Sequence, residues 1–276
     1  MKKTQKTLNP NKRPLLRFIH FHSIILAFAI TTTIPSCSIQ TNELAQIDNK
    51  LANLMHKIDE GTQIASQAPN YDVQPLENAN DNFAHYLITI EKNTQLLSYP
   101  LKEAKQSGLT IATAPDNLVR CYSWDTQTGG TMHFFRTVVQ YKCKNGTSKA
   151  IEMLTRTTEE DAGDPGWSFD SIHLLQTKSG QKVYLITGLG IYSTMDSGCI
   201  IQAYTINNND FKPIPFFQTK KSCLKEISYS GSGNIPQIEF TDQDKTLLIP
   251  IITKDGISTK RNLIYKFNGE KFVFQP

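Results

Sequence analysis

The first part of the chain has hydrophobic residues at helical spacing. Apolar side chains recur every three or four positions and predict an amphipathic helix over residues 44–58, with Gly61 placed as its C-cap. The residues of this stripe are Leu44, Ile47, Leu51, Leu54, Met55 and Ile58. Such a stripe indicates packing against a core or against an antiparallel helix.

The next stretch predicts a linker and two further helices. Residues 62–79 are rich in Gln, Asn, Ala and Pro, which is typical of a loop. A second helix is expected to begin at Asp81, a favourable N-cap, and to end before Pro100. A short third helix is expected over residues 100–106, with proline at its start and Gly108 just beyond its end.

From residue 109 onward, apolar and polar residues alternate, which is the period of a half-exposed β-strand. Turn pairs such as Asn145-Gly146, Asp255-Gly256 and Asn268-Gly269 separate the alternating segments. The predicted strands cover residues 109–113, 117–124, 131–143, 148–157, 171–177, 182–188, 199–206, 211–218, 225–230, 237–241, 247–252, 263–268 and 271–274.

These patterns predict the α+β class, with helices and strands segregated along the chain. A short helical region over residues 44–108 is followed by one antiparallel all-β domain over residues 109–276. Many short strands at this spacing fit a sandwich or an open barrel. A small β-propeller is the alternative, although no phrase recurs at the length of a propeller blade.

Composition narrows the class of protein further. The chain has 276 residues, of which 39% are hydrophobic and 20% are charged, so it has enough apolar surface for a folded core. Its mean hydropathy of −0.35 is too low for a protein with several membrane spans.

The N-terminus has the pattern of an export signal. A basic segment without acidic residues precedes a short apolar stretch over residues 24–30, which is too short to cross a bilayer. The basic residues are Lys2, Lys3, Lys6, Lys12, Arg13 and Arg17. Ile34-Pro35-Ser36-Cys37 then resembles the lipobox of bacterial lipoproteins. The resemblance covers about residues 1–40, and it implies a cellular location but no biochemical activity.

The lipoprotein resemblance implies a signal peptide over residues 1–36 and acylation of Cys37, followed by a polar tether over residues 37–43. It also implies attachment to the outer membrane, with the protein on the periplasmic face; plain secretion is the alternative. Six basic residues and no acidic ones leave with the signal, so the formal charge changes from +4 to −2. We therefore expect no nucleic-acid partner.

Four cysteines remain after Cys37. An even number of cysteines in an oxidising compartment favours disulfides, and four cysteines permit three connectivities. Their spacing suggests two local bridges, Cys121 with Cys143 and Cys199 with Cys223. Because no Cys-x-x-Cys pair or paired histidine spacing occurs, we expect no metal and no cofactor.

The segment from Arg120 to Arg136 is the best candidate for binding. A hairpin that turns symmetrically about Thr128 places Trp124 opposite Met132, Tyr122 opposite Phe134, and Arg120 opposite Arg136. Two facing arginines repel each other unless an anion lies between them. Arg120, Tyr122, Trp124 and Arg136 therefore form a candidate platform for an acidic sugar or a peptide carboxylate.

Three functional hypotheses fit these features. The first is a non-enzymatic envelope lipoprotein that binds a ligand or partner through its β domain. The second is a periplasmic hydrolase of glycan or peptide, for which Asp125, His133 or His173 would have to gather from separate strands. The third is a scaffold that docks a partner on the helix of residues 44–58. The absence of a nucleophile elbow or cofactor loop favours the first and third.

Overall fold

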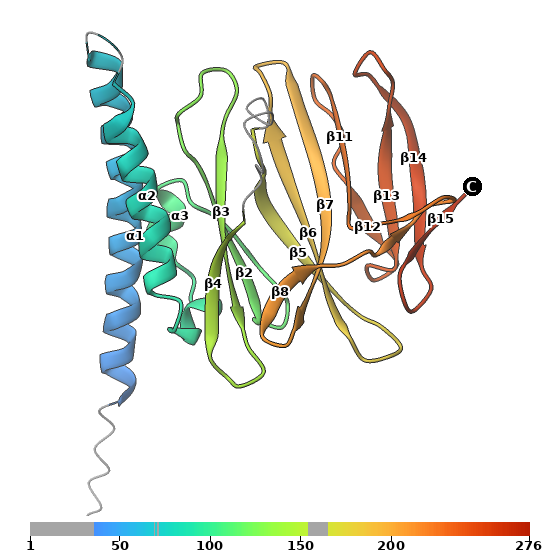
Figure 1. The fold of residues 1–276 in the computed structure, drawn as a ribbon, viewed down its shortest axis with the longest axis horizontal. Coiled ribbons are helices and arrows are strands. Elements are labelled where there is room, and N and C mark those ends of the chain that lie inside the picture. The colour runs from blue at the N-terminus through green and yellow to red at the C-terminus, as the bar shows by residue number, and fades with distance from the viewer. Residues whose placement is uncertain (1–35, 69, 71, 154–164) are drawn as a thin grey trace, which may run out of the picture.

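The helices form one outer layer of the molecule, and three β-sheets are stacked behind it in chain order (Figure 1). The computed structural model describes residues 36–68, 70, 72–153 and 165–276. The helical layer contains α1 (Ser36–Gln67), α2 (Gln74–Thr89), the 3-10 helix η1 (Thr94–Leu97) and α3 (Lys102–Gln106). Residues 1–35 of the predicted signal peptide lie outside the described residues.

The first sheet is an antiparallel meander that packs directly against the helices. It contains β1 (Thr110–Thr113), β2 (Val119–Asp125), β3 (Phe135–Lys142) and β4 (Ser148–Met153), in that order. The predicted strand over residues 148–157 runs partly outside the described residues.

The second sheet has the order β11-β7-β6-β5, with β8 paired to β7. Its strands are β5 (Ser168–Gln176), β6 (Lys182–Ile191), β7 (Asp196–Asn207), β8 (Asp210–Pro213) and β11 (Glu226–Ser232). The third sheet has the order β10-β9-β15-β14-β13-β12. Its strands are β9 (Phe217–Gln218), β10 (Cys223–Leu224), β12 (Glu239–Thr241), β13 (Thr246–Ile252), β14 (Ser258–Phe267) and β15 (Phe272–Gln275).

Three hydrophobic cores hold the four layers together. Between the helices and the first sheet, Leu51, Phe83 and Trp124 are among the buried residues. Phe169 and Tyr184 belong to the core between the first and second sheets. A third core lies between the second and third sheets. Because the first and second sheets are covered on both faces, successive residues of a strand alternate between two cores, and residues 119–124 of β2 are all buried.

The predicted α+β class and the antiparallel sandwich are confirmed. Every pair of described strands is antiparallel except β9 with β15. The sheets stack in series, and none of the described sheets closes into a barrel. A propeller would arrange its blades around one axis, whereas here the third sheet lies at the end of the stack farthest from the helices (Figure 1).

The boundaries of the first two helices differ from the prediction. The backbone of α1 is already helical from Ser36, so this helix includes residues 37–43, the segment predicted as a polar tether. The same helix continues through Gly61, which is therefore not a C-cap. Residues 62–79 are not a linker throughout, because α2 begins at Gln74, with Pro75 in its first turn, and Asp81 lies inside it. The predicted third helix corresponds to α3.

A buried carboxylate fixes α3 against α1. Asp48 of α1 is 4% exposed, and its two oxygens accept hydrogen bonds from the backbone N–H groups of Glu103 and Ala104, at 3.2 and 2.9 Å. These groups belong to the first turn of α3 and have no partner within that helix. A side chain of one helix thus caps the next, and this places the end of the helical layer over the first sheet.

Candidate ligand-binding site

The β2–β3 hairpin has a different register from the predicted one. Trp124 pairs with Arg136 rather than with Met132, a shift of four residues, and Arg120 pairs with Gln140 rather than with Arg136. The shift arises because β3 begins only at Phe135, so that the turn is long. Because four is even, the predicted residues still share the face of the sheet that meets the helices.

The connection between β2 and β3 is closed by a hydrogen bond of its own and is held to two other parts of the fold. Thr126 donates its N–H to the carbonyl of Phe134 at 2.8 Å, and His133 donates its N–H to the carbonyl of Ile191 in the second sheet. Gln127 hydrogen-bonds Asp59 and Thr62 of α1 through its side chain. These contacts explain why the hairpin does not turn symmetrically about Thr128.

Arg120 is a structural residue and does not face a ligand. It is 4% exposed, and its Nε donates to Oγ1 of Thr113 at 2.8 Å. Its Nη1 donates to the backbone carbonyls of Leu96 and Tyr99, which anchor η1 and the segment after it on the first sheet. Burial lowers the pKa of the guanidinium. The prediction that Arg120 binds a ligand is therefore wrong.

Tyr122 and Trp124 are also buried beneath the helices, at 2% and 1% exposure. The hydroxyl of Tyr122 donates to Oε1 of Gln140 at 2.9 Å, and burial raises the pKa of Tyr122 to about 12. The indole Nε1 of Trp124 donates to Oδ1 of Asn80 at 2.9 Å, and its ring meets Phe83 edge-on at 4.8 Å. The aromatic residues form a core and not an open platform, so this part of the ligand-binding prediction is also wrong.

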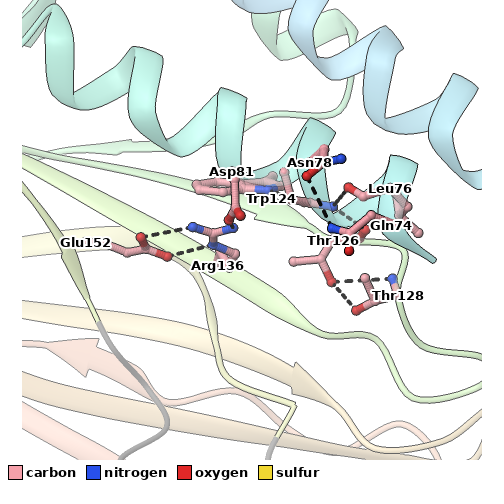
Figure 2. A network of polar contacts seen from close by, with 10 residues as sticks. Gln74, Leu76, Asn78, Asp81, Trp124, Thr126, Thr128, Arg136 and Glu152 are labelled. Carbon is pink, nitrogen blue, oxygen red and sulfur yellow. Dashed lines mark hydrogen bonds and ion pairs between the residues drawn. The ribbon is translucent and has the colours of Figure 1, made fainter.

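Arg136 is the one predicted binding residue that lines a cavity. Its Nε and Nη2 donate to the two carboxylate oxygens of Glu152 at 2.6 and 3.0 Å, and its Nη1 donates to Asp81 at 2.8 Å (Figure 2). Its guanidinium carbon lies 5.6 Å from the centre of the Trp124 ring. Burial lowers the pKa of Arg136, but its hydrogen bonds with Glu152 and Asp81 outweigh burial and raise it overall.

The cavity beside Arg136 lies where α2 meets the β2–β3 hairpin and β4. It has a volume of about 380 Å³, within the usual range for small-ligand sites. Its lining residues are Glu77, Asn80, Asp81, Thr126, Thr128, Phe134, Phe135, Arg136, Glu152 and Met153. One guanidinium and three carboxylates are therefore present at the same cavity.

Asn80 forms the inner wall of this cavity. It is 2% exposed, and its amide group donates to the backbone carbonyls of Leu76 and Thr126, both at 2.9 Å, while its oxygen accepts from Trp124. Figure 2 shows this network running from α2 to the hairpin. No local sequence pattern points to Asn80, Glu77 or Glu152, because their shared location depends on how α2 packs against β4.

The predicted disulfides are not present among the described residues. Cys121, Cys143, Cys199 and Cys223 are free thiols. Cys121 lies opposite Val139, which puts Cys143 about 13 Å further along the strand, beyond the reach of a disulfide. Cys199 lies opposite Tyr229 in the second sheet, whereas Cys223 begins β10 in the third.

One aspartate–histidine pair forms at the edge of the hairpin. Oδ2 of Asp125 lies 2.6 Å from Nδ1 of His133, and Oδ1 of Asp125 accepts from the backbone N–H of Gln127 at 2.8 Å. Both side chains are partly exposed, at 31% and 43%. The pair holds the turn in place and is adjacent in sequence to Thr126 and Phe134 of the cavity wall.

No protein-family model, curated protein or solved structure matches this chain. Within the part of the chain that the structure describes, no helix is long and apolar enough to cross a membrane. Over the same residues, no group of three or more His, Cys, Asp or Glu side chains is placed to hold a metal ion. The lipidation predicted at Cys37 depends on a side chain outside those that the structure describes.

Proposed function

We propose that this protein is a cell-envelope lipoprotein that binds a ligand in the cavity between α2 and the first sheet, and that this cavity is a binding site and not a catalytic one. The lipobox-like segment ending at Cys37 supports acylation and attachment to the outer membrane, on the periplasmic face. The three sheets and the long α1 provide a rigid support for the cavity.

The charges at the cavity favour a cationic ligand. Three of the guanidinium donors of Arg136 are already used on Glu152 and Asp81, so an acidic sugar would compete with carboxylates that the protein itself supplies. Glu77 adds a third carboxylate to the lining. This excess of carboxylates over one guanidinium is the observation that carries the proposal, and it points to an amine or guanidinium group such as that of a basic peptide.

The apolar stripe of α1, on which the scaffold hypothesis depends, is buried. Leu44, Ile47, Leu51, Met55 and Ile58 of α1 are all buried, at 7% exposure or less, in the core shared with α2 and the first sheet. The apolar stripe that suggested a partner helix is thus covered by the protein itself. We therefore do not propose docking through this helix.

Calorimetric titration of the full chain in detergent tests the proposed ligand class. The probes are the peptides acetyl-Gly-Arg-Gly-amide and acetyl-Gly-Glu-Gly-amide. We expect heat of binding from the arginine peptide and none from the glutamate peptide. Glu77→Gln should weaken binding about threefold, because one exposed charge contributes roughly 0.5–1 kcal/mol.

The matched control is Glu270→Gln, because Glu270 follows β14 in the third sheet, at the far end of the stack. This change should leave the affinity for the arginine peptide unaltered. Equal binding of both peptides, no binding of either, or the same affinity in both variants would overturn the assignment of the cavity as a cation site.

A further inference from the structure

A serine, a histidine and an aspartate meet where the second and third sheets face each other. Ser171 and His173 lie two residues apart on β5, an edge strand of the second sheet, and therefore point to the same side. Leu175, two residues further on, belongs to the core between the two sheets. Asp244 comes from the turn between β12 and β13, at the edge of the third sheet.

The three side chains are connected through the ring of His173. Oγ of Ser171 lies 3.2 Å from Nε2, and Oδ1 of Asp244 lies 3.2 Å from Nδ1. With Asp244 accepting the Nδ1–H, the ring has its proton on Nδ1, and Nε2 is left to accept the hydroxyl proton of the serine. This is the order of contacts that nucleophilic catalysis by serine requires.

The orientation of the imidazole is fixed from a further side. The ring of Phe240 stacks on that of His173, with the ring centres 3.7 Å apart and the planes inclined at 21°. Asp244 has a φ of 65°, after Asp242 at 54° and Gln243 at 53°. Three consecutive left-handed residues without a glycine are an unusual turn, and this turn brings the carboxylate to the histidine.

We propose that Ser171, His173 and Asp244 form a catalytic triad for the hydrolysis of small carboxylic esters. The site is open to solvent: the side chains of His173 and Asp244 are 25% and 38% exposed, and Ser171 is half-buried. A small cavity of about 30 Å³, large enough for a water molecule, is lined by Asp170 and by Thr187, the cross-strand neighbour of Ser171.

The reaction proceeds in two balanced steps. Oγ of Ser171 bonds to the carbonyl carbon of the ester, its proton passes to Nε2 of His173, and the same proton goes to the leaving alkoxide as the C–O bond breaks. A water then gives a proton to Nε2 and attacks the acyl carbon. The carboxylic acid leaves, and Oγ of Ser171 recovers the proton from His173. Asp244 keeps the ring oriented throughout and is a positioning residue.

Labelling and kinetics of the full chain in detergent test this proposal. A biotinylated fluorophosphonate should modify Ser171, as located by mass spectrometry of the peptides. Hydrolysis of p-nitrophenyl acetate should fall about 100-fold in kcat/KM in Ser171→Ala and in His173→Gln. Asp244→Asn should lower kcat at an unchanged KM, whereas loss of a purely structural contact would lower the thermal stability and leave kcat unchanged.

Ser228→Ala provides the matched control, because Ser228 lies exposed on β11 of the same sheet. We expect the fluorophosphonate not to label Ser228, and the Ser228→Ala variant to hydrolyse the ester at the original rate. Thermal unfolding of each variant separates loss of activity from loss of fold. Three outcomes would each overturn the proposal: no labelling, labelling at another residue, or hydrolysis within twofold of the original chain in a folded Ser171→Ala. None of them bears on the cavity beside Arg136, which lies in another layer of the molecule.

Discussion

Single buried polar residues link the helices to the first sheet. Asn80 reaches from α2 to Trp124 and Thr126, and Gln140 reaches from β3 to the backbone carbonyls of Glu91 and Asn93. Among the described residues, no buried side-chain nitrogen or oxygen lacks a hydrogen-bond partner. Such residues raise the cost of misplacing a layer, because a wrong arrangement leaves a polar group buried without a partner.

Replacing Asn80 tests this role directly. In Asn80→Ala, the indole N–H of Trp124 and the carbonyl of Thr126 lose their buried partner, and we expect the free energy of unfolding to fall by about 2 kcal/mol. Urea unfolding measures the change. Asn78→Ala, an exposed asparagine of the same helix, should change stability by less than about 0.5 kcal/mol. Equal effects of the two variants would contradict the assigned role.

The carboxylate of Asp196 should make the turn before β7 sensitive to acid. Hydrogen bonds donated by the hydroxyls of Ser232 and Ser193, at 2.6 and 2.9 Å, lower the pKa of Asp196. Because the pKa is lowered in the folded state, the contribution is present above the ordinary aspartate value of about 3.9. It is lost as the pH falls through the lowered value.

Ser232→Ala removes the larger cause of this shift, so the pKa of Asp196 should rise toward its ordinary value in an NMR titration of the carboxyl carbon. Ser230, two residues earlier on the same strand, pairs with Gly198 and provides the control. Ser230→Ala should leave the titration of Asp196 unchanged. A shift of the same size in both variants would show that the hydrogen bond from Ser232 is not the cause.

At the scale of elements, sequence periodicity predicted which segments are strands but not how far the helices extend. Gly61 follows an apolar stripe and matches a C-cap, yet α1 continues through it. A Cβ on Gly61 would lie 2.9 Å from the Cα of Leu76, so the missing side chain lets α2 approach α1. Local rules assign a glycine to a helix end, whereas only the packed pair of helices reveals the close contact.

Gly61→Ala should therefore lower the free energy of unfolding, whereas a glycine-to-alanine change inside a helix usually raises it. In an ordinary helix interior this change stabilises by about 1 kcal/mol. Here the added methyl group meets the backbone of α2, and we expect a loss of about 1–3 kcal/mol in the free energy of unfolding. Thermal and urea unfolding measure it, and a more stable variant would contradict the contact between α1 and α2.

Strand register was the least predictable feature of the candidate site. The alternation of residues placed Tyr122, Trp124 and Arg136 on one face correctly, because this depends only on the period of the strand. The pairing depended on a long connection held by His133 to the second sheet and by Gln127 to α1. These contacts join distant parts of the chain, and no local pattern indicates them.

At the scale of the whole molecule, the chain builds its layers in the order of the sequence. Helices, first sheet, second sheet and third sheet follow one another along the stack, so most contacts form between neighbouring segments (Figure 1). Only β9, β10 and β11 depart from this order, because β11 returns to the second sheet after β9 and β10 have joined the third. The α1 helix forms the outermost layer, and the predicted acylation site lies near its first residues.

The four cysteines after Cys37 are free thiols. Cys121 and Cys143 lie far apart along the first sheet, Cys199 lies in the second sheet and Cys223 in the third. Burial raises the pKa of the Cys121 and Cys199 thiols, which makes both slow to react in the folded protein. Alkylation in denaturant without a reductant should therefore modify all four. Under the proposed acylation, the lipid occupies the sulfur of Cys37, so Cys37 should not react.

The intact mass of the membrane-extracted protein tests the central proposal, that this is an acylated envelope lipoprotein, most directly. We predict a chain that begins at Cys37 and carries the mass of its acyl groups, and a Cys37→Ala variant that keeps its signal segment. A native chain that begins at Met1, or that is cut without added lipid mass, would contradict the proposal.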